Sequence, residues 1–200
     1  MQSKRTQEER SSATRSALLA AARPLFAARG YADVGTPEIV AAAGVTRGAL
    51  YHQFDGKLAL FEAVFEAVEQ EVTGRIGTLL AEAGATDPIG ALRAGAGAWL
   101  DACADPEVQR IVLLEAPAVL GWERWRELGL RYGLGLIEAV LTAAIAAGDL
   151  DEQPVRPLAH VLAGALDEAA LYVARADDPV AARAEVGAVL ERLVDGLLRS

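Results

Sequence analysis

The chain has little of the chemistry that most metalloproteins and many enzymes require. Its 200 residues include one cysteine, Cys103, and two histidines, His52 and His160. A single thiol excludes an intramolecular disulfide framework and a cysteine-based zinc site, and is typical of a reducing cytoplasm. The histidines and the cysteine show neither metal-ligand spacing nor a recognisable Cys-His pairing. The sequence therefore predicts no metal and no other cofactor.

Long uninterrupted apolar runs are missing as well. No stretch approaches the roughly 20 apolar residues that a membrane span needs. The N-terminal MQSKRTQEERSSATR is polar, and no apolar run behind it suggests a signal peptide. With 52% hydrophobic residues, the chain can form a substantial core, in one domain or in two closely packed ones. We therefore expect a globular cytoplasmic protein without a membrane partner.

No segment shows a convincing two-residue alternation of apolar and polar residues, so no strand is predicted. Apolar residues recur at helical spacing, which predicts an all-α fold of about nine helices, near residues 11–29, 37–43, 47–53, 57–82, 88–104, 106–115, 122–147, 155–176 and 179–198. Helix stops are predicted at Gly30, Gly84, Asp105-Pro106, Pro117, Gly148-Asp149, Pro154 and Asp177-Asp178-Pro179. The segment before about Gln7, which carries Lys4 and Arg5, is predicted to be a disordered arm. Pro24 lies inside the first helix, where a proline can introduce a kink.

The net charge of −9 is unevenly distributed along the chain. Residues 1–57 hold eight Lys or Arg against five Asp or Glu, a net charge of +3, whereas the remainder holds eleven against twenty-three, a net charge of −12. A basic N-terminal unit can bind phosphates while the acidic remainder stays away from a nucleic acid. The asymmetry becomes informative only together with a motif, because a small positive excess is common on protein surfaces.

Residues 35–57, GTPEIVAAAGVTRGALYHQFDGK, have the pattern of two short helices joined by a tight turn. Thr36 is expected to cap the first helix, and Pro37 is tolerated in its first turn. Gly44 can adopt the left-handed conformation that ends this helix. Thr46 is expected to cap a second helix over residues 47–53. The segment therefore predicts a helix-turn-helix.

The second helix of this motif has two distinct sides. Leu50 and Phe54 are four residues apart and point together toward a core. Gly48, Ala49 and His52 form the opposite side, whose small residues allow close approach to the major groove of DNA. Arg47 and Tyr51 flank this side and can contact guanine or phosphate. The residues expected at DNA are Thr36, Thr46, Arg47, Gly48, Ala49, Tyr51, His52, Gln53 and Lys57.

The N-terminal part of the chain resembles the TetR-type transcriptional regulators of bacteria. The matching elements are Leu25-Phe26, Gly30-Tyr31, Thr36-Pro37-Glu38-Ile39, Ala41-Ala42-Ala43-Gly44-Val45-Thr46-Arg47-Gly48, Leu50-Tyr51-His52-Gln53-Phe54 and Lys57. Many positions agree at fixed spacing over roughly the first quarter to third of the chain, so the signal is specific. Gln53 departs from the pattern, which often has His or Tyr there, and so does Pro24 in the first helix.

The resemblance implies a domain division and a dimer. Residues 1–56 would form the helix-turn-helix DNA-binding domain, and residues 57–200 a larger helical domain for effector binding and dimerisation. The last two helices carry long apolar stripes that a single subunit does not need in full. In TetR-type regulators the final helices of two subunits pack as a four-helix bundle. The expected interface residues are Leu162, Leu166, Tyr172, Val186, Leu190, Leu193 and Leu197; the alternative is that both stripes are buried within one subunit.

The middle of the chain contains all three tryptophans, and the segment EAPAVLGWERWRELGLRYGLGL is rich in glycine and aromatic residues. As in the family, these helices are expected to enclose a largely apolar effector pocket. The candidate pocket residues are Trp99, Cys103, Trp122, Trp125, Tyr132 and His160. The alternative for each residue is a role in core packing, and for His160 a hydrogen-bonded core position.

An enzyme is the competing class and has little support. The chain has no glycine-rich phosphate loop after a strand, and acidic pairs such as Asp151-Glu152 and Asp167-Glu168 are interpreted as solvated charges. The sequence therefore predicts a ligand-responsive regulator, most simply a repressor, that binds a palindromic operator as a homodimer and is released by a small effector. An activator of the same architecture, or a helical module that binds protein instead of DNA, remain the alternatives.

Overall fold

The computed structural model describes the backbone of residues 2–83 and 87–198, and the side chains of residues 7–82 and 87–198. The described chain forms nine continuous helical segments: α1 (Gln2–Arg29), α2 (Thr36–Ala42), α3 (Arg47–Gln53), α4 (Gly56–Ala83), α5 (Pro88–Cys103), the run of α6 (Pro106–Val108), η1 (Gln109–Glu115) and α7 (Ala116–Leu120), then α8 (Trp122–Ala147), α9 (Val155–Ala174) and α10 (Pro179–Asp195). In this part of the chain, strand-like pairing is limited to one isolated bridge between Leu150 and Leu198. The predicted all-α fold is confirmed.

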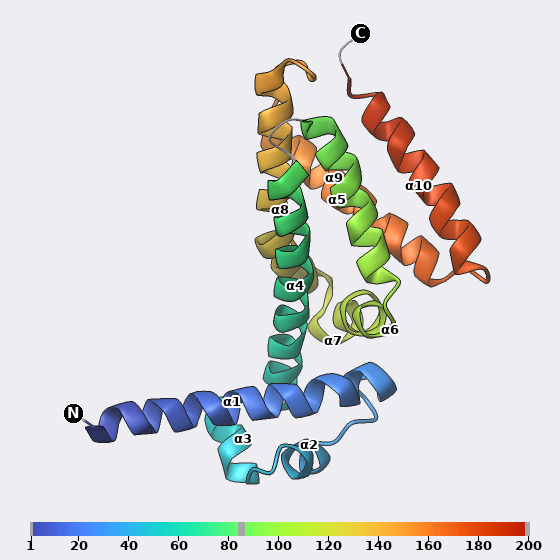
Figure 1. Cartoon of the computed structure of the whole chain (residues 1–200). Coiled ribbons are helices and arrows are strands. Elements are labelled where there is room, and N and C mark those ends of the chain that lie inside the picture. Colours follow the sequence, from blue (N-terminus) through green and yellow to red (C-terminus); the bar gives the residue numbers. More distant parts are fainter. Residues whose placement is uncertain (1, 84–86, 199–200) are drawn as a thin grey trace.

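Helices α1, α2 and α3 form a small bundle at one end of the molecule (Figure 1). Helix α4 starts at this bundle and runs upward into a larger helical body that contains α5, α8, α9 and α10 (Figure 1). The bundle is closed by Leu18 and Phe26 from α1, Ile39 from α2 and Leu50 from α3, all fully buried. Because Leu50 faces inward, the opposite side of α3 faces away from the bundle.

The bundle and the body share one hydrophobic core. Phe26 packs edge-on against Phe61 of α4, with ring centroids 5.2 Å apart, and Tyr31 packs edge-on against the same ring at 5.3 Å. Ile111 of η1 belongs to this cluster as well. The apolar contacts therefore continue from the helix-turn-helix into the helices above it, without a polar layer between them.

Lys57, at the start of α4, holds the turn that follows α1 against α4 by hydrogen bonds. Its ammonium donates to the carbonyl oxygens of Tyr31 at 2.8 Å and Val34 at 3.0 Å, and lies 4.0 Å from the centroid of the Tyr31 ring. Two of its three N–H groups are thus used inside the protein. This differs from the expected role at a DNA phosphate, because the side chain turns back onto the bundle.

Two expected features at helix ends are corrected. Helix α1 begins at Gln2 rather than near residue 11, so the backbone of the predicted arm is helical; its Lys, Arg, Gln and Glu residues favour helix. The side chains of Lys4 and Arg5, and the stop predicted at Gly84, lie outside the described residues. Thr36 does not cap α2: Gly35 takes the extended N-cap position, and no side chain makes the capping bond.

The helical run Pro106–Leu120 also differs from the expectation. The predicted stop at Pro117 is wrong, since the chain remains helical to Leu120 and ends at Gly121, which has φ = 82°. Pro117 lies in the first turn of α7, directly after the π-helical segment η1, where its missing N–H is not required. Pro24 is likewise contained in a continuous α1.

Helix α8 is long and apolar enough to cross a membrane, by length and composition alone. Its apolar half contains Arg131 and Glu138, which pair with Glu66 of α4 and Arg156 of α9. Both charges are therefore neutralised by neighbouring helices, as in a packed helical bundle.

Glu69 is the one charged residue among the buried residues of the described chain, with 3% of its surface exposed. Burial, and secondarily the nearby Asp167 carboxyl, raise the pKa of Glu69 to about 8. The native protein therefore holds a proton on Glu69 at neutral pH, whereas the unfolded chain does not. Burial also raises the pKa of Asp167 to about 6, against the opposing effect of Arg126.

We predict that Glu69→Gln flattens the dependence of stability on pH. Between the ordinary value of 4.5 and about 8, native Glu69 retains a proton that the unfolded chain has released, so the free energy of unfolding falls as pH rises. The slope for one such group is at most about 1.4 kcal/mol per pH unit. Urea unfolding at pH 6, 7 and 8 and fixed protein concentration should show this fall in the wild type and lose most of it in Glu69→Gln.

The matched control is Glu185→Gln, which removes an exposed carboxylate from α10. Its stability should follow the wild-type pH dependence. Parallel curves for the wild type and Glu69→Gln would contradict the raised pKa.

Candidate nucleic-acid interface and ligand cavity

The turn between α2 and α3 has the geometry that the sequence predicts. Gly44 has φ = 65°, which places it in the left-handed region. The Thr46 hydroxyl accepts a hydrogen bond from the backbone N–H of Ala49 at 3.2 Å and so caps α3. Helix α3 spans Arg47–Gln53, the predicted range. The helix-turn-helix is therefore confirmed.

One side of α3 is available to a partner. Arg47, Gly48, Tyr51 and His52 are exposed, and Ala49 is partly exposed. The Arg47 guanidinium lies 5.5 Å from the centroid of the Tyr51 ring. Arg47, by hydrogen bonding and by charge, lowers the pKa of the Tyr51 hydroxyl. These side chains form a small polar and cationic surface around the glycine and alanine of the helix.

Thr36 joins this surface from α2. It is partly exposed and close enough to the Tyr51 hydroxyl to add to the lowering of the Tyr51 pKa. The structure thus brings together the N-terminus of α2 and the exposed side of α3. Thr46 lies at the edge of the same surface, with its hydroxyl already occupied by the Ala49 N–H.

Gln53 is placed differently from the expectation. Its amide donates to the Ser11 hydroxyl at 2.7 Å, and its backbone carbonyl accepts from Arg15 at 3.4 Å. Arg15 also lies 4.3 Å from the centroid of the Phe54 ring. Gln53 therefore holds α3 against α1 rather than extending freely from the surface.

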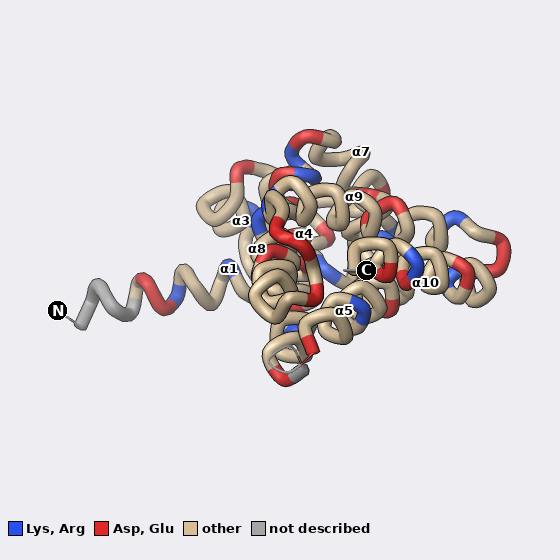
Figure 2. The backbone as a smooth tube through the Cα atoms, turned by 90° about the horizontal axis from the view of Figure 1, so that it is seen from above, with Lys and Arg blue, Asp and Glu red and all other residues tan. Residues whose placement is uncertain are grey.

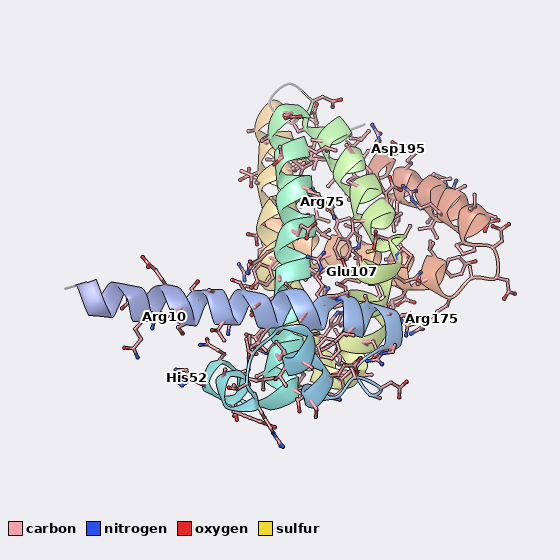
Figure 3. All side chains as sticks on the ribbon, turned by 60° about the horizontal axis from the view of Figure 1, so that its bottom comes forward. Arg10, His52, Arg75, Glu107, Arg175 and Asp195 are labelled. Carbon is pink, nitrogen blue, oxygen red and sulfur yellow. The ribbon has the colours of Figure 1, made fainter. Side chains whose placement is uncertain are left out.

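Helix α1 adds residues that sequence reasoning did not include. Gln7, Arg10, Ser11 and Thr14 border a shallow hollow whose other side is formed by Ala49, His52 and Gln53. Figure 3 shows Arg10 and His52 on the side of the bundle that faces away from the helical body. Seen from above, the N-terminal half of α1 extends beyond the body (Figure 2). In the sequence these four α1 residues recur at three- and four-residue spacing, which puts them on one face of a helix. This spacing could have identified them.

Two polar connections join the bundle to the body. Arg23 of α1 donates to Glu71 of α4 at 2.8 Å and to Glu107 of α6 at 2.7 Å. The carboxylate of Glu115, at the end of η1, accepts the backbone N–H of Tyr31 at 3.1 Å. Both connections involve α6 or η1, so a shift of this helical run would act directly on the end of α1.

Gly30 permits the second connection. It has φ = 79°, and a Cβ atom built on it would lie 2.3 Å from a carboxylate oxygen of Glu115. A side chain at this position would displace Glu115 and strain the backbone. The Gly30-Tyr31 pair thus allows the turn after α1 to pack closely against η1.

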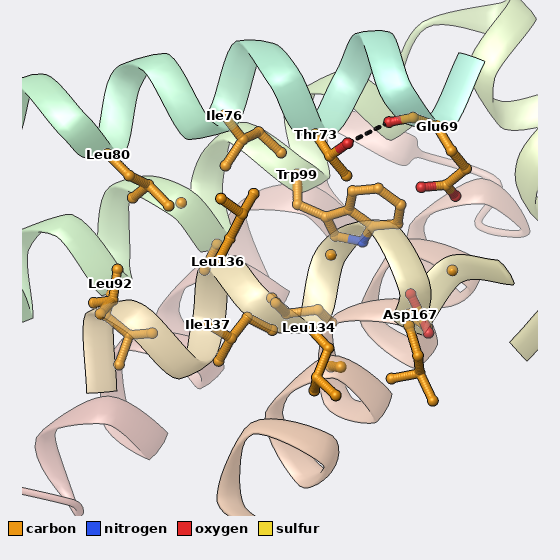
Figure 4. Close-up of a pocket in the computed structure, with 18 of the residues that line it drawn as sticks. Glu69, Thr73, Ile76, Leu80, Leu92, Trp99, Leu134, Leu136, Ile137 and Asp167 are labelled. Carbon is orange, nitrogen blue, oxygen red and sulfur yellow. Dashed lines mark hydrogen bonds between the residues drawn. The ribbon is translucent and has the colours of Figure 1, made fainter. Parts of the chain in front are cut away.

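A cavity lies in the body between α4, α5, α8 and α9. Its volume is about 860 Å³, including the part that is open to solvent. Most of the lining is aliphatic, with Ile76, Leu80, Leu92, Leu134 and Ile137 among the contributing residues (Figure 4). Polar groups are few and come from Glu69, Thr73, Trp99, Arg126 and Asp167. Val112 connects this lining to η1.

Two of the six predicted pocket residues line this cavity, Trp99 and Trp125. The Trp125 indole donates to the backbone carbonyl of Val112 at 2.9 Å and so ties α8 to η1. Trp122 is 62% exposed and packs against Trp125 from outside in a tilted arrangement, with ring centroids 4.8 Å apart and planes at 51°. It lies outside the cavity because it is the first residue of α8, at the surface.

The other three expected pocket residues also lie outside the lining. Cys103 is buried in the core, and burial raises the pKa of its thiol, so it is a poor nucleophile. The Tyr132 hydroxyl donates to Glu66 at 3.0 Å on the outer side of α4. His160 contributes its backbone carbonyl, which accepts from Arg126 at 3.3 Å.

The charged residues of the cavity were missed in the sequence. Asp167, interpreted there as a solvated charge, lines the cavity and forms an ion pair with Arg126. Glu69 was overlooked within the apolar stripe of α4, next to buried Val68. A carboxylate inside such a stripe is the signal that could have identified it.

The residues expected at a dimer interface fall into two groups. Tyr172 and Leu193 are 55% and 50% exposed on α9 and α10. Leu162, Leu166, Val186, Leu190 and Leu197 are partly buried, and Leu166 lines the cavity. The structure also exposes Val161 on α9 and Val189 on α10, which belong to the apolar stripes of these two helices.

Comparisons with known proteins identify both parts of the chain. Residues 18–64 match the family model described as "Bacterial regulatory proteins, tetR family". Residues 89–197 match the model described as "Tetracyclin repressor-like, C-terminal domain". The first match contains the helix-turn-helix, and the second contains most of the helices around the cavity.

Individual relatives agree with this result. The crystal structure of a TetR-family transcriptional regulator from Pectobacterium atrosepticum is 35% identical, covers 96% of this chain and 97% of its own, and superposes with a TM-score of 0.83. The Transposon Tn10 TetC protein of Escherichia coli is 29% identical over 82% of both chains. The HTH-type transcriptional regulator CymR of Pseudomonas putida is 38% identical over 43% of this chain and 42% of its own. The chain therefore belongs to the TetR family of bacterial transcriptional regulators, which bind DNA through a helix-turn-helix domain.

Proposed function

We propose that this protein is a repressor that binds a palindromic operator as a homodimer and is released by a largely apolar small molecule. The observation that carries the proposal is the exposed side of α3, where Arg47, Tyr51 and His52 surround Gly48 and Ala49. A helix with small residues at its centre and donors at its edge fits the major groove. In this proposal residues 1–56 bind DNA in the cytoplasm, and residues 57–200 bind the effector and the second subunit.

The α3 residues would have different tasks at DNA. Arg47 is suited to a guanine edge, Tyr51 and His52 to phosphate oxygens, and Ala49 to a thymine methyl group. Thr36 would contact the backbone beside Tyr51, and Arg10 would extend the contact along α1. Lys57 and Gln53 would act mainly by holding the bundle together, since their polar groups are engaged within it.

The dimer would form through α9 and α10. Tyr172 and Leu193 are large side chains that are half exposed on adjacent helices, and Val161 and Val189 extend the apolar surface. Packing the same surface of a second subunit against it gives a two-fold arrangement. Such symmetry would present two α3 helices to two half-sites of a palindrome.

Effector release would use η1. Val112 and Trp125 line the cavity and are joined by a hydrogen bond of 2.9 Å, while Glu115 on the same π-helical segment holds the N–H of Tyr31. An effector that fits better when η1 has shifted would favour a different position of the bundle. Operator affinity then falls by the ratio of the effector's affinities for the two states.

A genome-derived DNA-fragment selection with the purified protein tests the proposal. We expect a palindromic motif that is bound much more tightly than random DNA, within a promoter whose transcription rises when the gene for this protein is deleted. Falling transcription on deletion would indicate an activator of the same architecture. Weak binding without sequence preference, persisting after bound small molecules are removed, would favour the helical protein-binding module.

We predict that Arg47→Ala reduces the discrimination between operator and random DNA by about 1–3 kcal/mol, the usual contribution of a bidentate contact to guanine. Fluorescence anisotropy with both DNAs at several salt concentrations measures this difference. Arg156→Ala is the matched control, since it removes the same charge from an exposed position on α9. Equal discrimination by Arg47→Ala and the control would remove Arg47 from base recognition.

We also predict that Leu193→Asp converts the dimer to a monomer, because it places a charge on the exposed apolar surface of α9 and α10. Sedimentation velocity should show the change in mass, and operator affinity should fall at least roughly tenfold when the half-sites are no longer bound together. Leu79→Asp is the control, because Leu79 is an exposed leucine on α4, away from that surface. A Leu193→Asp protein that remains dimeric would place the interface elsewhere.

A further inference from the structure

Trp99 presents a polar group to the cavity that has no partner. Its indole nitrogen is buried, and the described residues provide no hydrogen-bond acceptor for it. The other cavity tryptophan differs, since the Trp125 indole is satisfied by the carbonyl of Val112. Buried N–H groups are nearly always paired. An unpaired one at the wall of a cavity indicates that an acceptor binds there.

Glu69 provides a second group of this kind. It lines the same cavity, and among the described residues its carboxyl takes part in no hydrogen bond or ion pair, while its backbone carbonyl accepts from the Thr73 hydroxyl at 2.6 Å. Figure 4 shows the carboxyls of Glu69 and Asp167 and the indole of Trp99 at the same end of the cavity. A ligand group at this end of the cavity therefore lies near both Glu69 and Trp99.

The remaining polar groups each have a partner within the protein. Asp167 and Arg126 form an ion pair, and Arg126 also donates to the carbonyl of His160 at 3.3 Å. The Thr73 hydroxyl is occupied by the carbonyl of Glu69. A ligand therefore meets one N–H donor and one carboxyl without a partner among the described residues, three polar side chains that already have partners, and an otherwise mainly apolar wall.

The charge balance selects among ligand types. Glu69 and Asp167 face a single cation, Arg126, so the cavity has no spare positive charge for an anionic ligand. At neutral pH Glu69 carries a proton, because burial raises its pKa to about 8, and it can donate a hydrogen bond. An ammonium group could pair with an ionised Glu69 but has no lone pair for the N–H of Trp99.

We propose that the cavity binds a neutral, mainly apolar molecule through one uncharged oxygen, a hydroxyl or a carbonyl, that accepts from Trp99 Nε1 and bonds to the Glu69 carboxyl. This inference rests on the proposed function, because it takes the cavity as the effector site. It names the chemical class of the effector and the two residues that recognise it.

The test is calorimetric titration of the full-length protein with five matched probes: 4-propylphenol, butyrophenone, butylbenzene, 4-propylbenzylamine and 4-propylbenzoate. We expect the phenol or the ketone to bind at least about tenfold more tightly than butylbenzene, which lacks the oxygen. The amine and the benzoate should bind more weakly than the neutral oxygen compounds. Preference for either charged probe, or equal binding of all five, would overturn the proposal, as would binding by none.

Variants assign the contact. Trp99→Phe keeps an aromatic ring but removes the N–H, and should reduce the advantage of the oxygen probe over butylbenzene to below about threefold. Glu69→Leu should reduce it as well, whereas Glu69→Gln, which can still bond to oxygen, should retain most of it. Trp122→Phe is the control, because Trp122 is exposed outside the cavity. An unchanged advantage in Trp99→Phe would overturn the role of the indole.

The pH dependence of binding affinity distinguishes a carbonyl oxygen from a hydroxyl oxygen on the ligand. A ketone needs the proton of Glu69, so its affinity should fall as pH rises through about 8, while a phenol can donate to the ionised carboxylate and should be less affected. The titratable groups that face Glu69 are Asp167 of α9, Arg126 of α8 and Cys103 of α5. Asp167, with a pKa raised to about 6, has largely completed its titration below this range.

The proposed function can fail independently of this inference. The probe titrations use the protein without DNA, so their result stands even if no operator is found. If the probes bind as expected but do not lower the affinity for a selected operator, the chemistry of the cavity is supported and its role as the effector site is overturned.

Discussion

The hydrogen bond from the Tyr31 N–H to the Glu115 carboxylate is the constraint on which the orientation of the helix-turn-helix bundle relative to the helical body depends. It fastens the turn after α1 to the end of η1, and Gly30 leaves the space for the carboxylate. Arg23 adds a second attachment through Glu107 on the same helical run. Apolar packing around Phe61 is non-directional, whereas these polar contacts require a defined geometry. They therefore set the orientation of the helix-turn-helix relative to the cavity.

The π-helical segment η1 is the element that both sites share. Val112 lines the cavity, Ile111 belongs to the core shared with the bundle, and Glu115 holds Tyr31. A π-helix has less favourable hydrogen bonding than an α-helix and is frequent at functional sites. The position of η1 between the cavity and the turn after α1 is the basis for the role that we propose for it in effector release.

The cavity contains groups that a core built for stability alone would not contain. A buried carboxyl at Glu69 and an unpaired indole N–H at Trp99 both lower the stability of the empty protein. Functional sites commonly carry such costs because the same groups provide recognition when a ligand is bound. Arg126 and Asp167, by contrast, pair with each other in the same cavity.

The sequence by itself determined the all-α fold, the helix-turn-helix and the family, because these depend on local spacing: the cap at Thr46, the left-handed Gly44 and the inward pair Leu50 and Phe54. It did not determine which side chains meet across helices. Tertiary packing alone turned Gln53 toward Ser11 and Lys57 toward the carbonyl of Tyr31, and kept Trp122 out of the cavity. The same holds for Glu69 and Asp167, which meet on α4 and α9 although almost a hundred positions separate them in the sequence. Helical periodicity reports which face of a helix is apolar, but only the packed arrangement decides which neighbour that face meets and whether a cavity remains between them.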